Sequence, residues 1–178
     1  MNKIGVMQGR LLPKLNNRYQ AHPRNYWQEE FSICAEIGID SIEFILDFDY
    51  SEENPLIKKD GIGEIQSVIK KTNVTVESIC ADYFMEAPLH SEDPKSAIAS
   101  AKVLSNLIPN ASNLGVRDIV IPCVDQSSIN SEAAADRFIN NLMPIIEIAE
   151  NNKVNLSLET DLPPSSFLKL LNSFNSRI

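Results

Sequence analysis

Val154-Asn-Leu-Ser-Leu-Glu-Thr-Asp161 is the stretch around which the chain is organised. Its apolar residues alternate with small polar ones, which is the period of a β-strand with one face against helices. The polar face of this strand ends in Glu159. Ligands of parallel α/β folds gather at the C-terminal ends of strands, so chemistry is expected at Glu159. The same pattern also fits a solvated carboxylate at a strand end.

Length and composition indicate one globular domain. The chain has 178 residues, of which 43% are hydrophobic and 22% charged, enough for one core and short for two domains. We therefore expect a single domain over residues 1–178. The net charge of -8 disfavours nucleic-acid partners, which need a basic patch. Without a signal-peptide pattern or a membrane-spanning apolar run, we expect a cytoplasmic protein with no membrane partner.

Three widely spaced cysteines, Cys34, Cys80 and Cys123, form no CxxC pair and no cluster with histidines. A disulfide framework and a zinc ribbon are therefore not expected. Each cysteine falls in an apolar helix or strand pattern, and we predict that all three fill the core.

Strand and helix patterns alternate five times along the chain. Strands are predicted at 3–7, 41–46, 74–81, 118–123 and in the 154–161 stretch, and helices at 27–37, 62–71, 96–114, 132–151 and 163–174. Gly38 should stop the first helix, Ser131 should cap the fourth, and Pro109 with Asn110 should kink or split the third. Residues 11–26 form a long loop, which usually carries function or disorder.

Five βα units in tandem imply parallel strands, either in an open doubly wound sheet or in a (β/α)8 barrel. The first turn, Gln8-Gly-Arg-Leu11, lacks the glycine-rich pattern of nucleotide-binding sheets. A barrel is favoured by polar side chains at nearly every strand end: Gln8, Glu43, Asp82, Asp125 and Glu159. The predicted fold is α/β, of the (β/α)8 TIM-barrel type, incomplete, with about five βα units.

Four segments carry a family resemblance: Ile4-Gly-Val-Met-Gln-Gly-Arg-Leu11, Ser41-Ile-Glu-Phe-Ile45, Ser78-Ile-Cys-Ala-Asp82 and Leu156-Ser-Leu-Glu-Thr160. In their order and spacing the chain resembles the sugar phosphate isomerase/epimerase superfamily, the xylose isomerase-like barrels. The resemblance covers essentially the whole chain, but only about the N-terminal two-thirds of a barrel. It implies a metal-dependent isomerase or epimerase that moves a proton next to the carbonyl of a sugar or sugar phosphate, through an enediolate.

The resemblance also implies a divalent metal, Mn²⁺, Mg²⁺, Co²⁺ or Zn²⁺, at the C-terminal mouth of the barrel. Glu159 corresponds to one metal ligand and to one of two carboxylates that transfer the proton. The remaining ligands and the second carboxylate would lie on strands that follow Ile178. The metal site is therefore expected to be incomplete, and the sequence leaves open whether these 178 residues are active alone.

Six further residues are candidates for contacts with the sugar: Gln8, Arg10, His22, Glu43, Asp82 and His90. Glu43 and Asp82 could each bind a hydroxyl or support a neighbouring strand. Arg10 could pair with a phosphate or, as the favoured alternative, with another acid. The two histidines lie in loops, where an exposed side chain without a ligand is the commoner outcome.

Two other functions compete with a sugar isomerase. One is a non-catalytic partial barrel that assembles with another chain. The other is an apurinic endonuclease of the same superfamily, which the net charge and the lack of extra metal-binding histidines disfavour. Because five strands leave two sheet edges and part of the lumen uncovered, we also expect a homo-oligomer.

Overall fold

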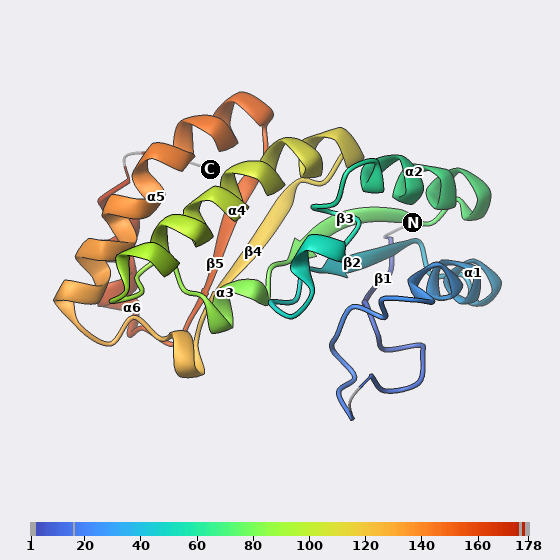
Figure 1. The fold of residues 1–178 in the computed structure, drawn as a ribbon, viewed down its shortest axis with the longest axis horizontal. Coiled ribbons are helices and arrows are strands. Elements are labelled where there is room, and N and C mark those ends of the chain that lie inside the picture. Colours follow the sequence, from blue (N-terminus) through green and yellow to red (C-terminus); the bar gives the residue numbers. More distant parts are fainter. Residues whose placement is uncertain (1–2, 16, 175, 177–178) are drawn as a thin grey trace.

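The computed structural model describes residues 3–15, 17–174 and 176. These residues form one parallel sheet with the strand order β1-β2-β3-β4-β5 (Figure 1). The strands are β1 (Gly5–Met7), β2 (Ser41–Ile45), β3 (Thr75–Cys80), β4 (Asp118–Cys123) and β5 (Asn155–Thr160). A doubly wound sheet would reverse its strand order at a switch point, whereas here the order follows the chain, as in the wall of a barrel.

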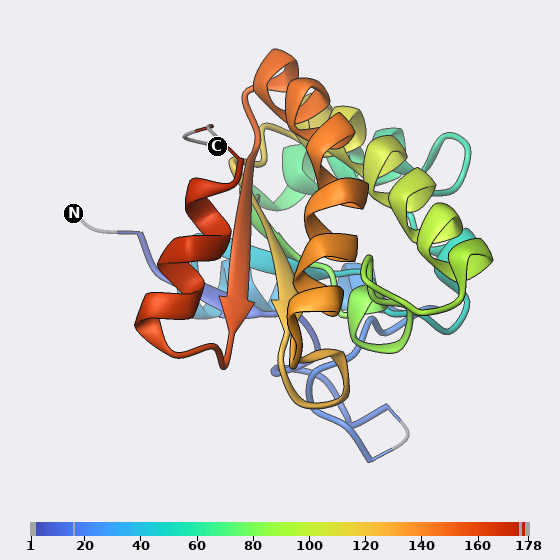
Figure 2. The ribbon, with the colours of Figure 1, turned by 90° about the vertical axis from the view of Figure 1, so that its left-hand side faces the viewer.

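The helices are α1 (Trp27–Ile37), α2 (Gly61–Thr72), α3 (Tyr83–Glu86), α4 (Pro94–Leu114), α5 (Glu132–Asn152) and α6 (Pro164–Asn172), with 3-10 turns η1 (Ser51–Glu53) and η2 (Asp125–Ser127). Helices α1, α2, α4 and α5 pack against one another in that order, along the same face of the sheet (Figures 1 and 2). This arrangement is typical of right-handed βαβ crossovers. No described helix is long and apolar enough to cross a membrane.

The two faces of the sheet differ in chemistry. Toward the helices, the strands present buried apolar side chains, such as Phe44, Ile79 and Ile119, which pack with the apolar faces of the helices. Full burial of one such side chain contributes about 1.5–3 kcal/mol. The opposite face corresponds to the lumen of a barrel and is polar. There Asp118 accepts hydrogen bonds from Asn155 Nδ2 at 2.9 Å and from Ser157 Oγ at 3.1 Å.

Several local predictions are confirmed. Helix α1 has the predicted bounds and ends at Gly38, whose φ of 80° lies in the left-handed region that glycine adopts freely. Ser131 caps α5, and its side chain accepts a hydrogen bond from Ala134 N at 3.1 Å. The three cysteines are buried and unpaired. The helix end at Gly38 and the cap at Ser131 act within one turn of chain, so the sequence shows them directly.

Two details of the helices differ from what the sequence suggests. Of the kink or split predicted at Pro109 and Asn110, the split does not occur: α4 runs unbroken from Pro94 to Leu114, although proline removes one helical hydrogen bond. Burial of Leu107 and Ile108 on the core side offsets this loss, and Asn110 Nδ2 donates to Leu56 O at 2.8 Å instead of breaking the helix. Ile37, the last residue of α1, is apolar but 58% exposed.

Candidate active site

An open cleft of about 1250 Å³ lies at the C-terminal ends of the strands. Its walls are built by the loop after β1, the segments that follow β2, β3 and β4, and the end of β5. Of the predicted site residues, Arg10, His22, Asp82 and Glu159 line this cleft. The C-terminal end of parallel strands is where (β/α)8 barrels carry their sites, and the cleft occupies that position.

Glu159 is an exposed residue of β5 and lines the cleft. It lies in register with Pro122 of β4, and both residues face the cleft. The outward residue Leu156 is buried, as the alternating pattern of this strand predicts. The strand therefore presents one carboxylate to the cleft while its apolar face packs against helices.

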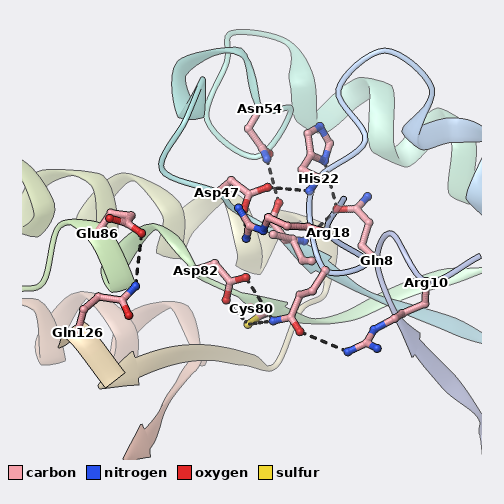
Figure 3. A network of polar contacts seen from close by, with 12 residues as sticks. Gln8, Arg10, Arg18, His22, Asp47, Asn54, Cys80, Asp82, Glu86 and Gln126 are labelled. Carbon is pink, nitrogen blue, oxygen red and sulfur yellow. Dashed lines mark hydrogen bonds and ion pairs between the residues drawn. The ribbon is translucent and has the colours of Figure 1, made fainter. Parts of the chain in front are cut away.

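Asp82 lines the cleft and belongs to a polar network (Figure 3). Gln20 Nε2 donates to Asp82 Oδ2 at 3.2 Å, and Cys80 Sγ donates to Asp82 Oδ1 at 3.1 Å. Gln20 Oε1 in turn accepts from Arg10 Nη2 at 3.5 Å. Burial and then the Asp82 charge raise the pKa of Cys80 well above its ordinary value, so the thiol stays protonated and can donate. These contacts orient the Asp82 carboxylate.

His22 is buried, at 3% exposure, and the expectation of an exposed loop histidine is wrong. Its ring packs near Phe44, with centroids 5.3 Å apart, and its Nδ1 lies 3.1 Å from Gln8 Oε1. Gln8 Oε1 can only accept hydrogen bonds, and it also accepts one from Ile45 N at 3.0 Å. We therefore assign Nδ1 of His22 as a donor. Burial, followed by the charges of Arg24 and Lys58, lowers the pKa of His22 to about 3, and the ring is neutral.

The sequence prediction missed Asp47, a half-buried carboxylate that lines the cleft. It accepts hydrogen bonds from His22 N at 2.7 Å and from Arg18 Nη2 at 3.3 Å, so it ties the loop after β1 to the end of β2. Burial raises its pKa. Asp47 directly follows the predicted second strand, and the strand-end rule that selected Asp82 would also have selected it.

Glu30 was missed as well, although its carboxylate also holds the loop after β1. It is 0% exposed and accepts from Gly9 N at 2.8 Å and from Leu11 N at 3.0 Å. The backbone on both sides of Arg10 is therefore anchored to α1. Burial raises the pKa of Glu30. The sequence does hold a sign of this role: Glu30 is an acid on the helix face that also carries the buried residues Trp27 and Cys34.

Three predicted residues do not line the cleft. Gln8 is buried behind it and supports His22. Glu43 accepts a hydrogen bond from Ser78 Oγ on the polar face of the sheet, which is the supporting role that the sequence left open. His90 is not brought to the site at all. It is buried at 7% exposure with its ring centroid 6.1 Å from that of Phe138, so the expectation that it is exposed is wrong.

A divalent metal site is not complete in the described part of the chain. Among residues 3–15, 17–174 and 176, no group of three or more His, Cys, Asp or Glu side chains could hold a metal ion. Protein sites for such ions normally need three or more ligands from the chain. Glu159 can offer one carboxylate, and the residues present do not by themselves fit the metal that the family resemblance implies.

Solved structures with a similar fold include sugar epimerases. D-Psicose 3-epimerase with D-tagatose, from Clostridium cellulolyticum H10, has a TM-score of 0.71 and 16% identity, over 98% of this chain and 60% of that one. L-Ribulose 3-epimerase has a TM-score of 0.70 and 18% identity, over 99% and 58% of the two chains. The present chain thus spans about three-fifths of the length of these neighbours, and identities this low show the fold alone.

A third neighbour is a xylose isomerase-like TIM barrel protein from Mycobacterium smegmatis, in complex with magnesium. Its TM-score is 0.70 at 14% identity, over 98% of this chain and 62% of that one. No curated protein sequence matches the chain. The family model described as xylose isomerase-like TIM barrel matches residues 31–175, most of the sequence. Together with the parallel sheet in barrel order, this match shows that the chain belongs to the xylose isomerase-like TIM barrel family.

Proposed function

We propose that the chain forms part of a sugar or sugar-phosphate isomerase or epimerase, in which Glu159 carries the proton. The observation that supports this most directly is the exposed carboxylate at the end of β5, in a cleft that also holds Asp47, Asp82 and Asp125, each just after another strand. Membership of the family and the fold shared with sugar epimerases point the same way.

The proposed reaction begins when the Glu159 carboxylate accepts the proton of a C–H bond next to the carbonyl carbon of the sugar. The electrons of that bond form a carbon–carbon double bond, and the carbonyl electrons move onto oxygen, which gives an enediolate. Protonation of the same carbon on the opposite face, by a second acid outside these 178 residues or by water, gives an epimer and leaves the first proton on Glu159. Delivery of the proton from Glu159 to the neighbouring carbon, on the same face, gives an isomer. General acid–base catalysis of this kind contributes about 10²–10⁴ to the rate.

The other polar groups of the cleft are proposed to hold the hydroxyls of the sugar. The Asp82 carboxylate is fixed by Gln20 and Cys80 and retains lone pairs that can accept from a hydroxyl. Arg10, whose backbone is anchored by Glu30, offers donors at the side of the cleft. A bound polyol would therefore meet acceptors and donors in positions that are set before it arrives.

Hydrogen exchange tests the proton transfer without knowledge of the final product. D-Psicose, D-tagatose, D-fructose and L-ribulose are incubated in D₂O with the protein at near-stoichiometric concentration, and loss of the proton next to the carbonyl is followed by ¹H NMR. We expect exchange above the buffer rate for at least one sugar, and exchange at the buffer rate in Glu159→Gln. Glu147→Gln, an exposed acid on α5, is the matched control. Equal exchange in Glu159→Gln and wild type contradicts the assignment.

A second candidate function is assembly with another chain, and the strand order favours it. In the described sheet β1 and β5 each have one strand neighbour, so both edges have backbone groups free to pair. Such edges are otherwise covered or closed into a barrel. We expect light scattering at micromolar concentration to show a dimer or larger species. A monomer with a cooperative melt contradicts this expectation.

A further inference from the structure

Tyr50 lines the cleft and has no role in the proposed mechanism. It lies between β2 and η1 and is 60% exposed. Its backbone has φ 58° and ψ 28°, in the left-handed region that L-residues with large side chains rarely adopt. A bulky aromatic residue that is held both exposed and in an unfavourable backbone conformation needs a physical reason.

Among the described residues with positive φ other than glycine, Tyr50 is the only one with an aromatic ring. Asn73 and Lys153 adopt the same conformation, but each ends a helix, where this conformation satisfies the last carbonyls. Tyr50 precedes only the three-residue turn η1. Strained backbone positions of this kind cluster at functional sites, where the surrounding structure holds them in place.

The ring of Tyr50 is held from one side. The guanidinium carbon of Arg24 lies 3.4 Å from the ring centroid, and Arg24 also forms an ion pair with Glu53 of η1. One ring face is therefore covered by a fixed cation. Since the residue remains largely exposed and lines the cleft, the opposite face is open to a bound molecule.

We propose that the open face of Tyr50 is a stacking platform for the ring form in which a sugar first binds in the cleft, before the ring opens to the carbonyl form that reacts, and that Tyr50 selects among sugars. The inference rests on the proposed function. A sugar ring carries C–H groups on the face from which its hydroxyls point away, and such a face packs against an aromatic ring, while the hydroxyls bind polar groups. Sugars with one continuous C–H face are favoured over epimers in which a hydroxyl interrupts that face.

Ligand-observed NMR tests the platform. Saturation-transfer spectra and titrations are recorded with D-psicose, D-tagatose, D-fructose and L-ribulose, for wild type, Tyr50→Phe and Tyr50→Gly. In wild type, protons of one ring face should receive the strongest saturation. Tyr50→Phe keeps the platform and should bind within about 2-fold of wild type. Tyr50→Gly should bind about 3- to 10-fold more weakly, which corresponds to the usual strength of an aromatic contact.

Two controls separate stacking from changes in the backbone. Glycine adopts the left-handed conformation without strain, so Tyr50→Gly should melt no lower than wild type. Tyr50→Asn is a second variant, because asparagine also tolerates the left-handed conformation. Lys153→Gly makes the same backbone change at φ 56°, at the end of α5, and should leave sugar affinity unchanged.

The outcomes distinguish the platform from the proposed function. If wild type binds a sugar and both Tyr50→Gly and Tyr50→Asn bind it equally well, the platform is refuted and the proposed function stands. If wild type binds none of the four sugars, the proposed function fails and the platform fails with it. Weaker binding in both variants, with Tyr50→Phe unaffected, supports the platform.

Discussion

The buried, neutral His22 makes a sharp prediction about acid stability. In the folded chain its pKa is lowered from 6.5 to about 3, because burial disfavours the charged ring. In the unfolded chain the imidazole returns to water and to its ordinary pKa. Below about pH 6.5 the unfolded state therefore binds a proton that the folded state rejects, and the free energy of unfolding falls as the pH falls, until the folded pKa is reached.

The size of this effect follows from the difference between the two states. One pKa unit corresponds to about 1.36 kcal/mol. Between about pH 7 and pH 5 the folded ring stays neutral while the unfolded ring becomes almost fully protonated, so His22 alone should remove about 2 kcal/mol of unfolding free energy. This is a large part of the total stability of a domain, about 5–15 kcal/mol.

Urea denaturation at the two pH values, followed by circular dichroism, measures the loss. Other groups also titrate in this range, including His90, whose pKa is lowered by burial in the same direction. The matched variant is His22→Asn, whose side-chain amide can still donate to Gln8 Oε1 but does not titrate. We expect wild type to lose about 2 kcal/mol more than His22→Asn between the two pH values. An equal loss in both proteins would refute a neutral, desolvated His22.

Two further predictions concern packing. Leu156→Ala should lower the free energy of unfolding by about 2–5 kcal/mol, because Leu156 is buried under the helices. Glu159→Gln should leave it nearly unchanged. If chemical denaturation gives the reverse order, the two faces of β5 are exchanged. Gly61→Ala should destabilise the fold by about 1–3 kcal/mol, since the new Cβ would lie 2.2 Å from Pro55 O. Gly63→Ala places its Cβ in open space, with no atom within 4 Å, and should stabilise the fold by about 0.5–1 kcal/mol. Equal melting temperatures of the two variants would contradict the close approach at Gly61.

The order of strands and helices could be predicted from the sequence, because the signals that set it are local. Alternation over a few residues defines β5, apolar spacing defines α1, and Gly38 ends that helix by its own backbone freedom. The position of Glu159 at a strand end is of the same kind, since it depends on counting within one strand.

The register of β3 could not be predicted in this way. Pairing passes from Ile42 with Val76 to Glu43 with Ser78, so one residue of β3 is left out of the ladder. Beyond this irregularity Ser78 faces Glu43, and Cys80 and Asp82 follow on the same side. A bulge changes which face every later residue occupies, and it is set by the neighbouring strand.

The surroundings of the candidate site were decided by tertiary structure alone. His22 belongs to a loop, yet it is buried because that loop brings its ring against Gln8, which follows β1, and Phe44 of β2. Glu30 became an anchor for the same reason, because the backbone of Gly9 reaches its carboxylate. Whether a polar side chain is exposed, neutral or an anchor depends on the groups that pack around it, and those groups come from distant segments that no local pattern brings together.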